Sequence, residues 1–303
     1  MSYNKSDFVE IGNNGKLLNE FLESLPKIDN TELEKRSKLD YSLIKSKESG
    51  RDNLNLLTTL IDLTTLEGSD TTQKVEELIN KATLPELRNN LPEVAAICIY
   101  GDLVGSARFY LKSINNNTLK VAAVSTAFPS GRASINVKLL DTNEALQAGA
   151  DEIDMVIDRG ALLMGQYQKV YKEIKAIKEL SGNKVVKVII ESGELGSYEN
   201  IKKASYLAMI AGADFIKTST GKIPVGATPS TVICMIDCIN EFYKETGVKV
   251  GIKPSGQIKS YRDGLNYLNL VRESLGSEWL SPNLFRIGAS SMLDDIIFQS
   301  RNL

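Results

Sequence analysis

Lys217 is the residue whose position in the sequence points most directly to chemistry. It follows the short apolar stretch Phe215-Ile216 and stands where a buried strand is expected to end. Burial disfavours the charged ammonium and lowers the pKa of a lysine, and a neutral amine can attack a carbonyl carbon to form a Schiff base. The turn that follows, Thr220-Gly221-Lys222, suits an anion such as phosphate. The alternative is a surface loop rich in lysine and threonine, because most lysines are exposed.

A second lysine, Lys253, ends a later apolar stretch in the same way as Lys217 ends its own. Neighbouring strands lie about 4.8 Å apart, so lysines at equal height on adjacent strands have close ammonium groups. Like charges held that close lower the pKa of one of the two amines. This geometry therefore predicts a strong Schiff-base site. The alternative is a pair of solvated lysines at the rim of the fold.

Asp154 lies within an apolar stretch, on the same strand face as Glu152. An acidic side chain inside a protein needs a cation or a hydrogen-bond donor beside it, and Lys253 is the partner that we favour. In that position Asp154 would have a catalytic role. The alternative is a buried ion pair without a catalytic role, for instance with Lys187 on the next stretch.

Apolar stretches and stretches of helical periodicity alternate eight times from residue 51 onward. Eight such units without a linker, over about 250 residues, predict an α/β fold, a single (β/α)8 TIM barrel over residues 51–303. An open doubly wound sheet would usually have fewer strands. Residues 1–50 are polar and predict a mostly helical or partly disordered N-terminal extension. The expected strands are 60–64, 94–99, 119–124, 152–156, 184–190, 215–217, 248–253 and 284–287, and the expected helices are 72–82, 104–113, 135–148, 167–180, 199–211, 229–246, 261–275 and 291–299.

Small residues follow the last two expected strands, at Gly256 and in the run Gly288-Ala289-Ser290-Ser291. In barrels of this kind the chemistry lies at the C-terminal ends of the strands, and phosphate is often held by the last two loops and a helix N-terminus. Together with Gly221 and Lys222, these residues predict a phosphate site at one end of the barrel.

The composition argues against several classes of protein. A net charge of −2, from 36 basic and 38 acidic residues, argues against a general binder of nucleic acids or membrane surfaces. The sequence has no histidine, which removes the usual hydrolase triads and argues against zinc catalysis. Its three cysteines lack paired spacings, no apolar run reaches the length of a membrane span, and no signal peptide is evident. We expect a soluble, cytoplasmic protein.

Five motifs, in order along the chain, resemble those of deoxyribose-phosphate aldolase, a class I aldolase, in its eukaryotic form. The resemblance implies that Lys217 is the Schiff-base nucleophile, that Lys253 perturbs it and that Asp154 relays protons. It also implies substrate contacts from Asp62, Thr64 and Thr220, and phosphate contacts from Gly221, Lys222, Gly256, Gly288, Ser290 and Ser291. The motifs are Ile61-Asp62-Leu63-Thr64-Thr65-Leu66, Ala150-Asp151-Glu152-Ile153-Asp154, Asp214-Phe215-Ile216-Lys217-Thr218-Ser219-Thr220-Gly221-Lys222, Gly251-Ile252-Lys253-Pro254 and Arg286-Ile287-Gly288-Ala289-Ser290-Ser291.

The implied reaction is the reversible cleavage of 2-deoxy-D-ribose 5-phosphate to D-glyceraldehyde 3-phosphate and acetaldehyde, as in deoxyribonucleotide catabolism. An iminium on lysine serves as the electron sink, so neither a metal nor an organic cofactor is expected. The expected partners are small phosphorylated sugars and aldehydes, and a homodimer or larger homo-oligomer. One departure concerns the phosphate loop, where Gln257 and Lys259 stand in place of the glycine and arginine of many family members. The Gln257 side chain is expected to narrow this loop.

Three other functions fit parts of the pattern. Another Schiff-base aldolase or a transaldolase would keep the lysine and change the donor. A phosphate-binding isomerase barrel would use a carboxylate or histidine base, and the missing histidine counts against it. A barrel kept only as a binding or scaffolding protein would usually have lost the reactive lysine or its partner, whereas Lys217, Lys253 and Asp154 are all present.

Overall fold

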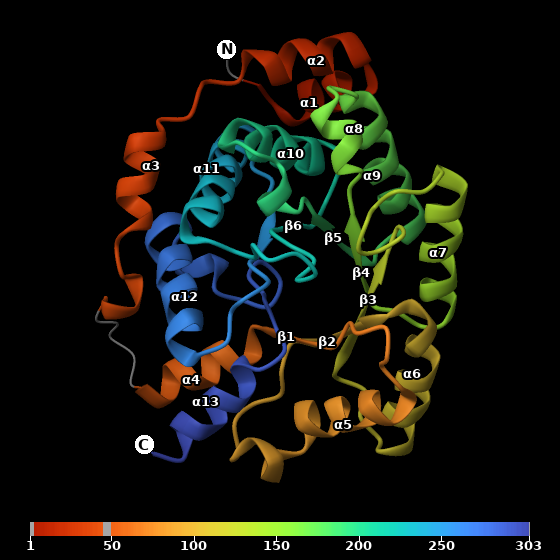
Figure 1. Cartoon of the computed structure of the whole chain (residues 1–303), viewed down its shortest axis with the longest axis vertical. Helices are drawn as coiled ribbons and strands as arrows, with labels where there is room; N and C mark the ends of the chain where they lie inside the picture. The colour runs from red at the N-terminus through yellow and green to blue at the C-terminus, as the bar shows by residue number, and fades with distance from the viewer. Residues whose placement is uncertain (1–2, 45–49, 303) are drawn as a thin grey trace.

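The computed structural model describes residues 3–44 and 50–302. Eight strands lie at the centre of the molecule, inside a ring of helices (Figure 1). All eight expected strands are present, most of them within one or two residues of the expected bounds. They are β1 (Ile61–Thr64), β2 (Ala96–Tyr100), β3 (Lys120–Ser125), β4 (Glu152–Val156), β5 (Val185–Ile189), β6 (Phe215–Lys217), β7 (Gly251–Lys253) and β8 (Ile287–Ala289).

The strands are parallel and their spatial order follows the chain, with β8 returning to pair with β1. Parallel bridges from Ile252 to Phe285 and from Ser255 to Gly288 join β7 to the segment that contains β8. The sheet therefore closes into the predicted (β/α)8 barrel. Closure brings the C-terminal ends of the strands together at one end of the barrel, which is where such folds place their chemistry.

The eighth strand is the one clear error in the expected bounds. Residues 284–286 were expected to begin it, but they bridge only to β7, and pairing with β1 starts at Ile287. The seventh strand also begins three residues later than expected, at Gly251. Each of these two short strands pairs as a ladder with one neighbour, β7 with β6 and β8 with β1.

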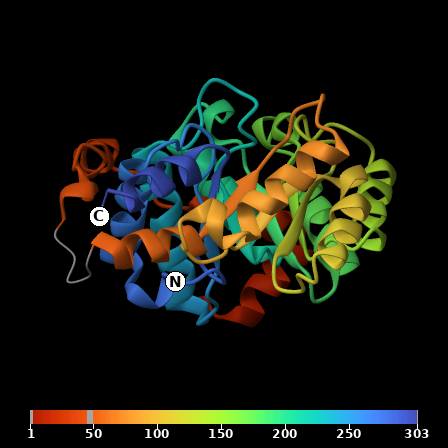
Figure 2. The same cartoon turned by 90° about the horizontal axis from the view of Figure 1, so that it is seen from below.

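The helices that follow the strands surround the barrel (Figure 2). Their bounds match the expected ones closely, and side-chain caps mark several of the starts, as at Thr228 and Ser260. Two helices, α4 and α8, were not expected. The α-helices of this part are α4 (Gly50–Thr59), α5 (Thr72–Thr83), α6 (Val104–Ser113), α7 (Ile135–Gln147), α8 (Arg159–Leu163), α9 (Tyr167–Ser181), α10 (Tyr198–Ile210), α11 (Pro229–Thr246), α12 (Tyr261–Leu275) and α13 (Met292–Ser300).

Short 3-10 helices occupy several of the connections: η2 (Pro85–Arg88), η3 (Gly101–Leu103), η4 (Ser192–Glu194) and η5 (Ser277–Trp279). The core lies between the strands and the helices, and it combines the apolar side chains that the strands turn outward with those on the inner faces of the helices. Such continuous apolar stretches are typical of parallel sheets covered on both faces. Within the described part of the chain, no helix combines the length and the apolar character that crossing a bilayer requires.

The N-terminal segment lies on the outside of the helical ring (Figure 1). It contains α1 (Lys5–Asn13), α2 (Gly15–Ser24), α3 (Asn30–Ser37) and the 3-10 helix η1 (Tyr41–Leu43). Phe8 packs against Phe242 of α11, and Arg36 of α3 forms an ion pair with Asp237 at 2.7 Å. The proposed division of the chain at residue 50 adjoins residues 45–49, which lie outside the described residues.

Candidate active site

Lys217 and Lys253 are opposite residues on neighbouring strands. The register of β6 and β7 pairs Lys217 with Lys253, and that of β4 and β5 pairs Asp154 with Lys187. All four side chains point into the barrel and are buried, with exposures of 2% for Lys217 and 0% for Lys253. The two lysines at the strand ends are therefore not solvated rim residues.

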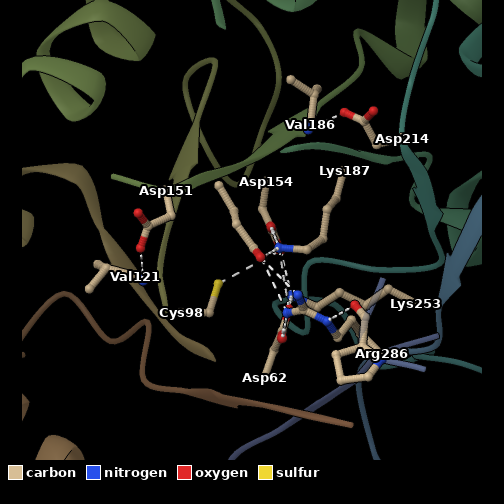
Figure 3. Close-up of polar contacts among 12 residues, drawn as sticks. Asp62, Cys98, Val121, Asp151, Asp154, Val186, Lys187, Asp214, Lys253 and Arg286 are labelled. Carbon is tan, nitrogen blue, oxygen red and sulfur yellow. Dashed lines mark hydrogen bonds and ion pairs between the residues drawn. The ribbon is translucent and has the colours of Figure 1, made fainter. Parts of the chain in front are cut away.

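Asp154 contacts Lys217, Lys187 and Lys253, and the last two are labelled beside it in Figure 3. Its Oδ2 accepts hydrogen bonds from Lys217 Nζ at 2.7 Å and from Lys253 Nζ at 2.6 Å, and its Oδ1 accepts one from Lys187 Nζ at 2.8 Å. Burial alone would raise the pKa of this carboxyl, but the three ammonium groups outweigh it and hold the pKa well below its usual range. Asp154 is thus an ionised acceptor within reach of both strand-end amines, as well as a partner of Lys187.

The two strand-end amines differ in their protonation. Burial lowers the pKa of Lys217, and the charge of Lys253 lowers it further against the opposing effect of Asp154. Burial also acts on Lys253, but the carboxylates of Asp154 and Asp62 outweigh it and raise the pKa of Lys253. Lys217 is consequently the amine of this pair that is neutral more readily.

Below these residues the barrel is filled by further ion pairs. Arg286 binds Asp62 at 2.5 Å and Glu152 at 2.8 Å, while Lys187 contacts Glu152 and Lys253 contacts Asp62. The connected group, here called the interior cluster, contains three carboxylates and four basic groups. With Lys217 neutral, three cations face three anions, and this balance favours the neutral amine in a medium where an unpaired charge is costly. The cluster consists of Asp62, Glu152, Asp154, Lys187, Lys217, Lys253 and Arg286.

A cavity of about 550 Å³ opens above the interior cluster at the C-terminal ends of the strands. Lys217 lines it and forms the contact between the cluster and the cavity. Seven of the other residues predicted to bind substrate also line it, whereas Asp62, Asp154 and Lys253 lie beneath and Ser291 lies at the start of α13. The seven lining residues are Thr64, Thr220, Gly221, Lys222, Gly256, Gly288 and Ser290.

Glycine is required at two of these lining positions. A Cβ atom on Gly256, whose φ is +84°, would lie 2.9 Å from Cα of Gly226 in the neighbouring loop. A Cβ atom on Gly288 would lie 2.7 Å from Cβ of Ser255 and 3.1 Å from Cε of Lys253. The backbones of three loops can therefore approach one another closely around the cavity, and the Lys253 side chain can pass Gly288 on its way into the barrel.

Comparison with known proteins shows the family to which this barrel belongs. The profile described as DeoC/LacD family aldolase matches residues 56–263. The chain belongs to this aldolase family. Human deoxyribose-phosphate aldolase is 44% identical over 248 residues, which are 78% of this chain and 77% of the human protein.

Solved structures support the fold of this aldolase. A structure from Coccidioides immitis superposes with a TM-score of 0.72 at 24% identity, covering 96% of this chain and 98% of its own. A deoxyribose phosphate aldolase from Aeropyrum pernix superposes with a TM-score of 0.62, also at 24% identity, covering 84% of this chain and 99% of its own. At these identities the likeness concerns the (β/α)8 fold alone.

The rim of the aldolase's cavity carries three lysines, Lys74, Lys222 and Lys259. Lys222 Nζ donates to Glu67 Oε1 at 2.8 Å, so the cation predicted to meet phosphate is shared with a carboxylate of the loop after β1. Lys74 pairs with Asp70 at 2.7 Å. The rim is therefore cationic, but two of its three ammonium groups already have an anionic partner.

Gln257 lines the cavity in a left-handed conformation, with φ +64°. This region favours glycine over residues with a side chain. The side-chain amide donates to the carbonyl oxygen of Pro224 in the loop after β6. Gln257 thus connects the β6 and β7 loops along the cavity wall, and the predicted narrowing of the phosphate loop stays a prediction.

Sequence reasoning named Lys187 only as an alternative partner and assigned no role to Glu67 or Lys74. Lys187 could have been found, because a lysine in the middle of the apolar stretch Val185–Ile189 is itself a signal of an ionic barrel interior. Glu67 gave no such signal, since it meets Lys222 only through the folding of two loops. Within residues 3–44 and 50–302, no group of three or more Cys, Asp or Glu side chains is placed to hold a metal ion; the absence of a cofactor stays a prediction.

Proposed function

We propose that this aldolase reversibly cleaves 2-deoxy-D-ribose 5-phosphate to D-glyceraldehyde 3-phosphate and acetaldehyde, through a Schiff base on Lys217. The observation that carries the proposal is the position of Lys217, a buried amine of lowered pKa that contacts Asp154 and also lines the cavity. The human and mouse relatives, each 44% identical to this chain, bear the name deoxyribose-phosphate aldolase.

The first step is attack of neutral Lys217 on C1 of the open-chain sugar. The carbinolamine that forms loses water and gives an iminium. Asp154 supports this step by accepting a hydrogen bond from the amine and so directing its Nζ. Thr64 and Thr220, which line the same cavity, are placed to contact the hydroxyl groups of the sugar.

The second step breaks the C2–C3 bond. A base removes the proton of the C3 hydroxyl, the C3–O bond becomes a carbonyl, and the electron pair of the C2–C3 bond moves to the iminium to form an enamine. Glyceraldehyde 3-phosphate leaves, C2 of the enamine takes up a proton, and hydrolysis releases acetaldehyde. Asp154 and Lys253 move these protons together with a water molecule, since they contact each other at 2.6 Å beside Lys217.

The phosphate end of the substrate is assigned to the rim that carries Gly221, Lys222, Gly256, Gly288 and Ser290. Ser291 occupies the N-cap position of α13 without a side-chain capping hydrogen bond, next to Ser290 of this rim. Asp62 is assigned an indirect role, because its carboxylate is held by Lys253 and Arg286 below the cavity. The iminium is the electron sink, so the reaction as written uses neither a metal ion nor an organic cofactor.

A cytoplasmic location and a homo-oligomeric state complete the proposal. The Aeropyrum pernix aldolase is described as a tetramer. This description supports self-association of the present chain as well. The expected partners are small phosphorylated sugars and aldehydes.

The test is borohydride trapping with 2-deoxyribose 5-phosphate, followed by mass spectrometry of the peptide that contains Lys217. A reduced two-carbon adduct on Lys217 would support the nucleophile and the donor in one measurement. The matched controls are Lys217→Ala, expected to trap nothing, and Lys222→Ala, expected to trap normally at saturating substrate because the rim lysine is not the nucleophile. A five-carbon phosphorylated adduct on Lys217, from reduction of the first iminium, would support the nucleophile alone. An adduct of any other size would indicate another aldolase or a transaldolase, and no adduct on any lysine would overturn the proposal.

A further inference from the structure

Glu191 is a buried carboxylic acid that the proposed mechanism does not use. It lies two residues after the end of β5, and its exposure is 0%. Its φ of +52° lies in the left-handed region, which a residue with a long side chain rarely adopts. An apolar residue would fill the same space without a buried carboxyl, so packing alone does not explain glutamate at this position.

Both carboxylate oxygens of Glu191 are directed at one residue, Thr220. Glu191 Oε1 accepts the backbone N–H of Thr220 at 3.1 Å, and Oε2 accepts the Thr220 hydroxyl. The Thr220 Oγ1 in turn accepts the backbone N–H of Lys222 at 3.0 Å. Glu191 therefore fixes Thr220, and the Thr220 hydroxyl in turn holds Lys222, so the two side chains together shape the turn after Lys217.

The backbone next to Glu191 holds the beginning of the same loop. Ile190 N–H donates to the carbonyl of Lys217 at 3.0 Å, and Ser192 N–H donates to that of Thr218 at 2.9 Å. The β5 loop and the β6 loop thus run side by side as far as Thr220. Beyond that point two side chains from other loops hold the turn that lines the cavity: Glu191 bonds Thr220, and Glu67 bonds Lys222.

We propose that Glu191 is a positioning residue that shapes the Thr220–Lys222 turn for the phosphate end of the substrate. The proposal rests on the function proposed above and deepens it. Glu191 itself lies outside the cavity lining, and both of its oxygens are occupied, so it does not touch the sugar. Its contribution is to fix the backbone before the anion arrives, which spares the substrate the cost of ordering the turn.

The test compares a phosphorylated with an unphosphorylated substrate. In Glu191→Ala, kcat/KM for 2-deoxyribose 5-phosphate should fall about tenfold to a hundredfold, mainly through KM, as the loss of hydrogen bonds to a charged group predicts. The kcat/KM for 2-deoxyribose should change by less than about threefold, because Lys217, Lys253 and Asp154 are untouched. Equal losses for both substrates, or no loss for either, would overturn the proposal.

A conservative variant separates positioning from general damage to the fold. Glu191→Gln keeps an oxygen for the Thr220 N–H and offers its NH₂ to the Thr220 hydroxyl oxygen, so it should restore most of the affinity lost in Glu191→Ala. If Glu191→Ala does not fold, Thr220→Val carries the test. This variant should lower the ratio of kcat/KM for 2-deoxyribose 5-phosphate to kcat/KM for 2-deoxyribose, as Glu191→Ala is expected to do. A Glu191→Gln protein as impaired as Glu191→Ala, or an unchanged ratio in Thr220→Val, would contradict the proposal.

Binding of inorganic phosphate distinguishes this inference from the function on which it rests. Calorimetric titration with phosphate needs no turnover, and Glu191→Ala should bind phosphate about tenfold or more weakly than the unmodified protein. A protein that binds phosphate through this turn but traps no adduct would overturn the aldolase proposal alone. A phosphate affinity unchanged in Glu191→Ala would overturn the positioning role alone.

Discussion

Lysines inside the barrel and lysines at the rim of the cavity have different surroundings. Lys253 is fully buried and contacts two carboxylates, whereas Lys222 is 25% exposed in its side chain and meets a glutamate, Glu67, that is 63% exposed. Charges in a water-excluded interior interact strongly, while charges at a surface are screened by water and salt. The interior cluster can therefore set the protonation of Lys217, whereas the rim lysines can only attract and orient the substrate.

The two regions also contribute to different properties: the interior cluster to the stability of the fold, and the rim to the affinity for substrate. Removing one member of the interior cluster leaves its partners charged and buried, which is strongly destabilising. Removing one member of a rim pair leaves the other in contact with water, at a cost near zero to 1 kcal/mol. Substitutions in the two regions should therefore differ in size and in the property that changes.

The largest effect is expected for Asp154→Asn. The amide cannot balance Lys187, Lys217 and Lys253, so we expect a loss of about 3–5 kcal/mol in the free energy of unfolding, measured by urea denaturation. We also expect kcat to fall by about two to four orders of magnitude, because a proton-transfer group is lost. A variant with the stability and turnover of the unmodified protein would refute the account of the interior cluster.

The same substitution has a predictable pH dependence. The pKa values of Asp62 and Asp154 are lowered in the folded protein from the ordinary value of 3.8. A carboxyl with a lowered pKa stabilises the fold above its unfolded pKa, and this stabilisation is lost as the pH falls below it. The stability difference between the unmodified protein and Asp154→Asn should therefore shrink below about pH 4, and a difference constant from pH 7 to pH 3 would contradict the assignment.

A second prediction concerns the reactivity of Lys217. Adduct formation requires the neutral amine, so its rate should rise with pH through the lowered pKa of Lys217, below the ordinary lysine value of 10.5. In Lys253→Met one of the charges that lowers this pKa is gone, and the pH–rate profile should move to higher pH. The measurement is the pH dependence of borohydride trapping with acetaldehyde, which carries no phosphate.

The rim supplies the matched control for that shift. Lys259 lines the cavity but lies outside the interior cluster, so Lys259→Met should leave the pH–rate profile for acetaldehyde unchanged. A profile that moves equally in both variants would mean that the overall positive charge of the site, rather than the neighbouring amine, controls Lys217.

The contrast between the two regions also explains how much could be predicted from the sequence. The strands, and with them the height of Lys217, Lys253 and Asp154, follow from short apolar stretches that end in a charged residue or, for Asp154, contain one. Parallel register then brings these residues together, whatever the loops do. The rim could not be derived in this way, because Glu67 and Lys222 are 155 residues apart and meet only through loop conformation.

Glu191 is an intermediate case. It lies two residues after β5, in the loop at the C-terminal end of the barrel, where polar residues are candidates for the site. Its contact with Thr220, however, depends on a left-handed backbone that no local pattern predicts for glutamate. Position along a strand could be predicted from the sequence, whereas the direction of the chain after the strand could not.

A smaller effect is expected at the rim from Glu67→Gln. Removing this carboxylate frees Lys222 for the substrate phosphate, and an exposed pair is worth up to about 1 kcal/mol, so KM for 2-deoxyribose 5-phosphate should fall by up to about fivefold. Stability and kcat should be unchanged. Steady-state kinetics at low and high salt provide the check, since the gain should be smaller at high salt; a raised KM would mean that Glu67 helps to hold Lys222 in place.

The smallest effect is expected at Gln257, where a strained backbone and a side-chain hydrogen bond oppose each other. Gln257→Ala keeps the left-handed φ of +64° and loses the bond to the Pro224 carbonyl, so it should destabilise the protein by about 1 kcal/mol. Gln257→Gly loses the same bond but relieves the strain, at the cost of a more flexible unfolded chain. In urea denaturation, the free energy of unfolding of the glycine variant should therefore be about 0.5–1 kcal/mol higher than that of the alanine variant. If alanine is the more stable of the two, the left-handed conformation is not a source of strain, and the loop is set by the contact between Gln257 and Pro224 instead.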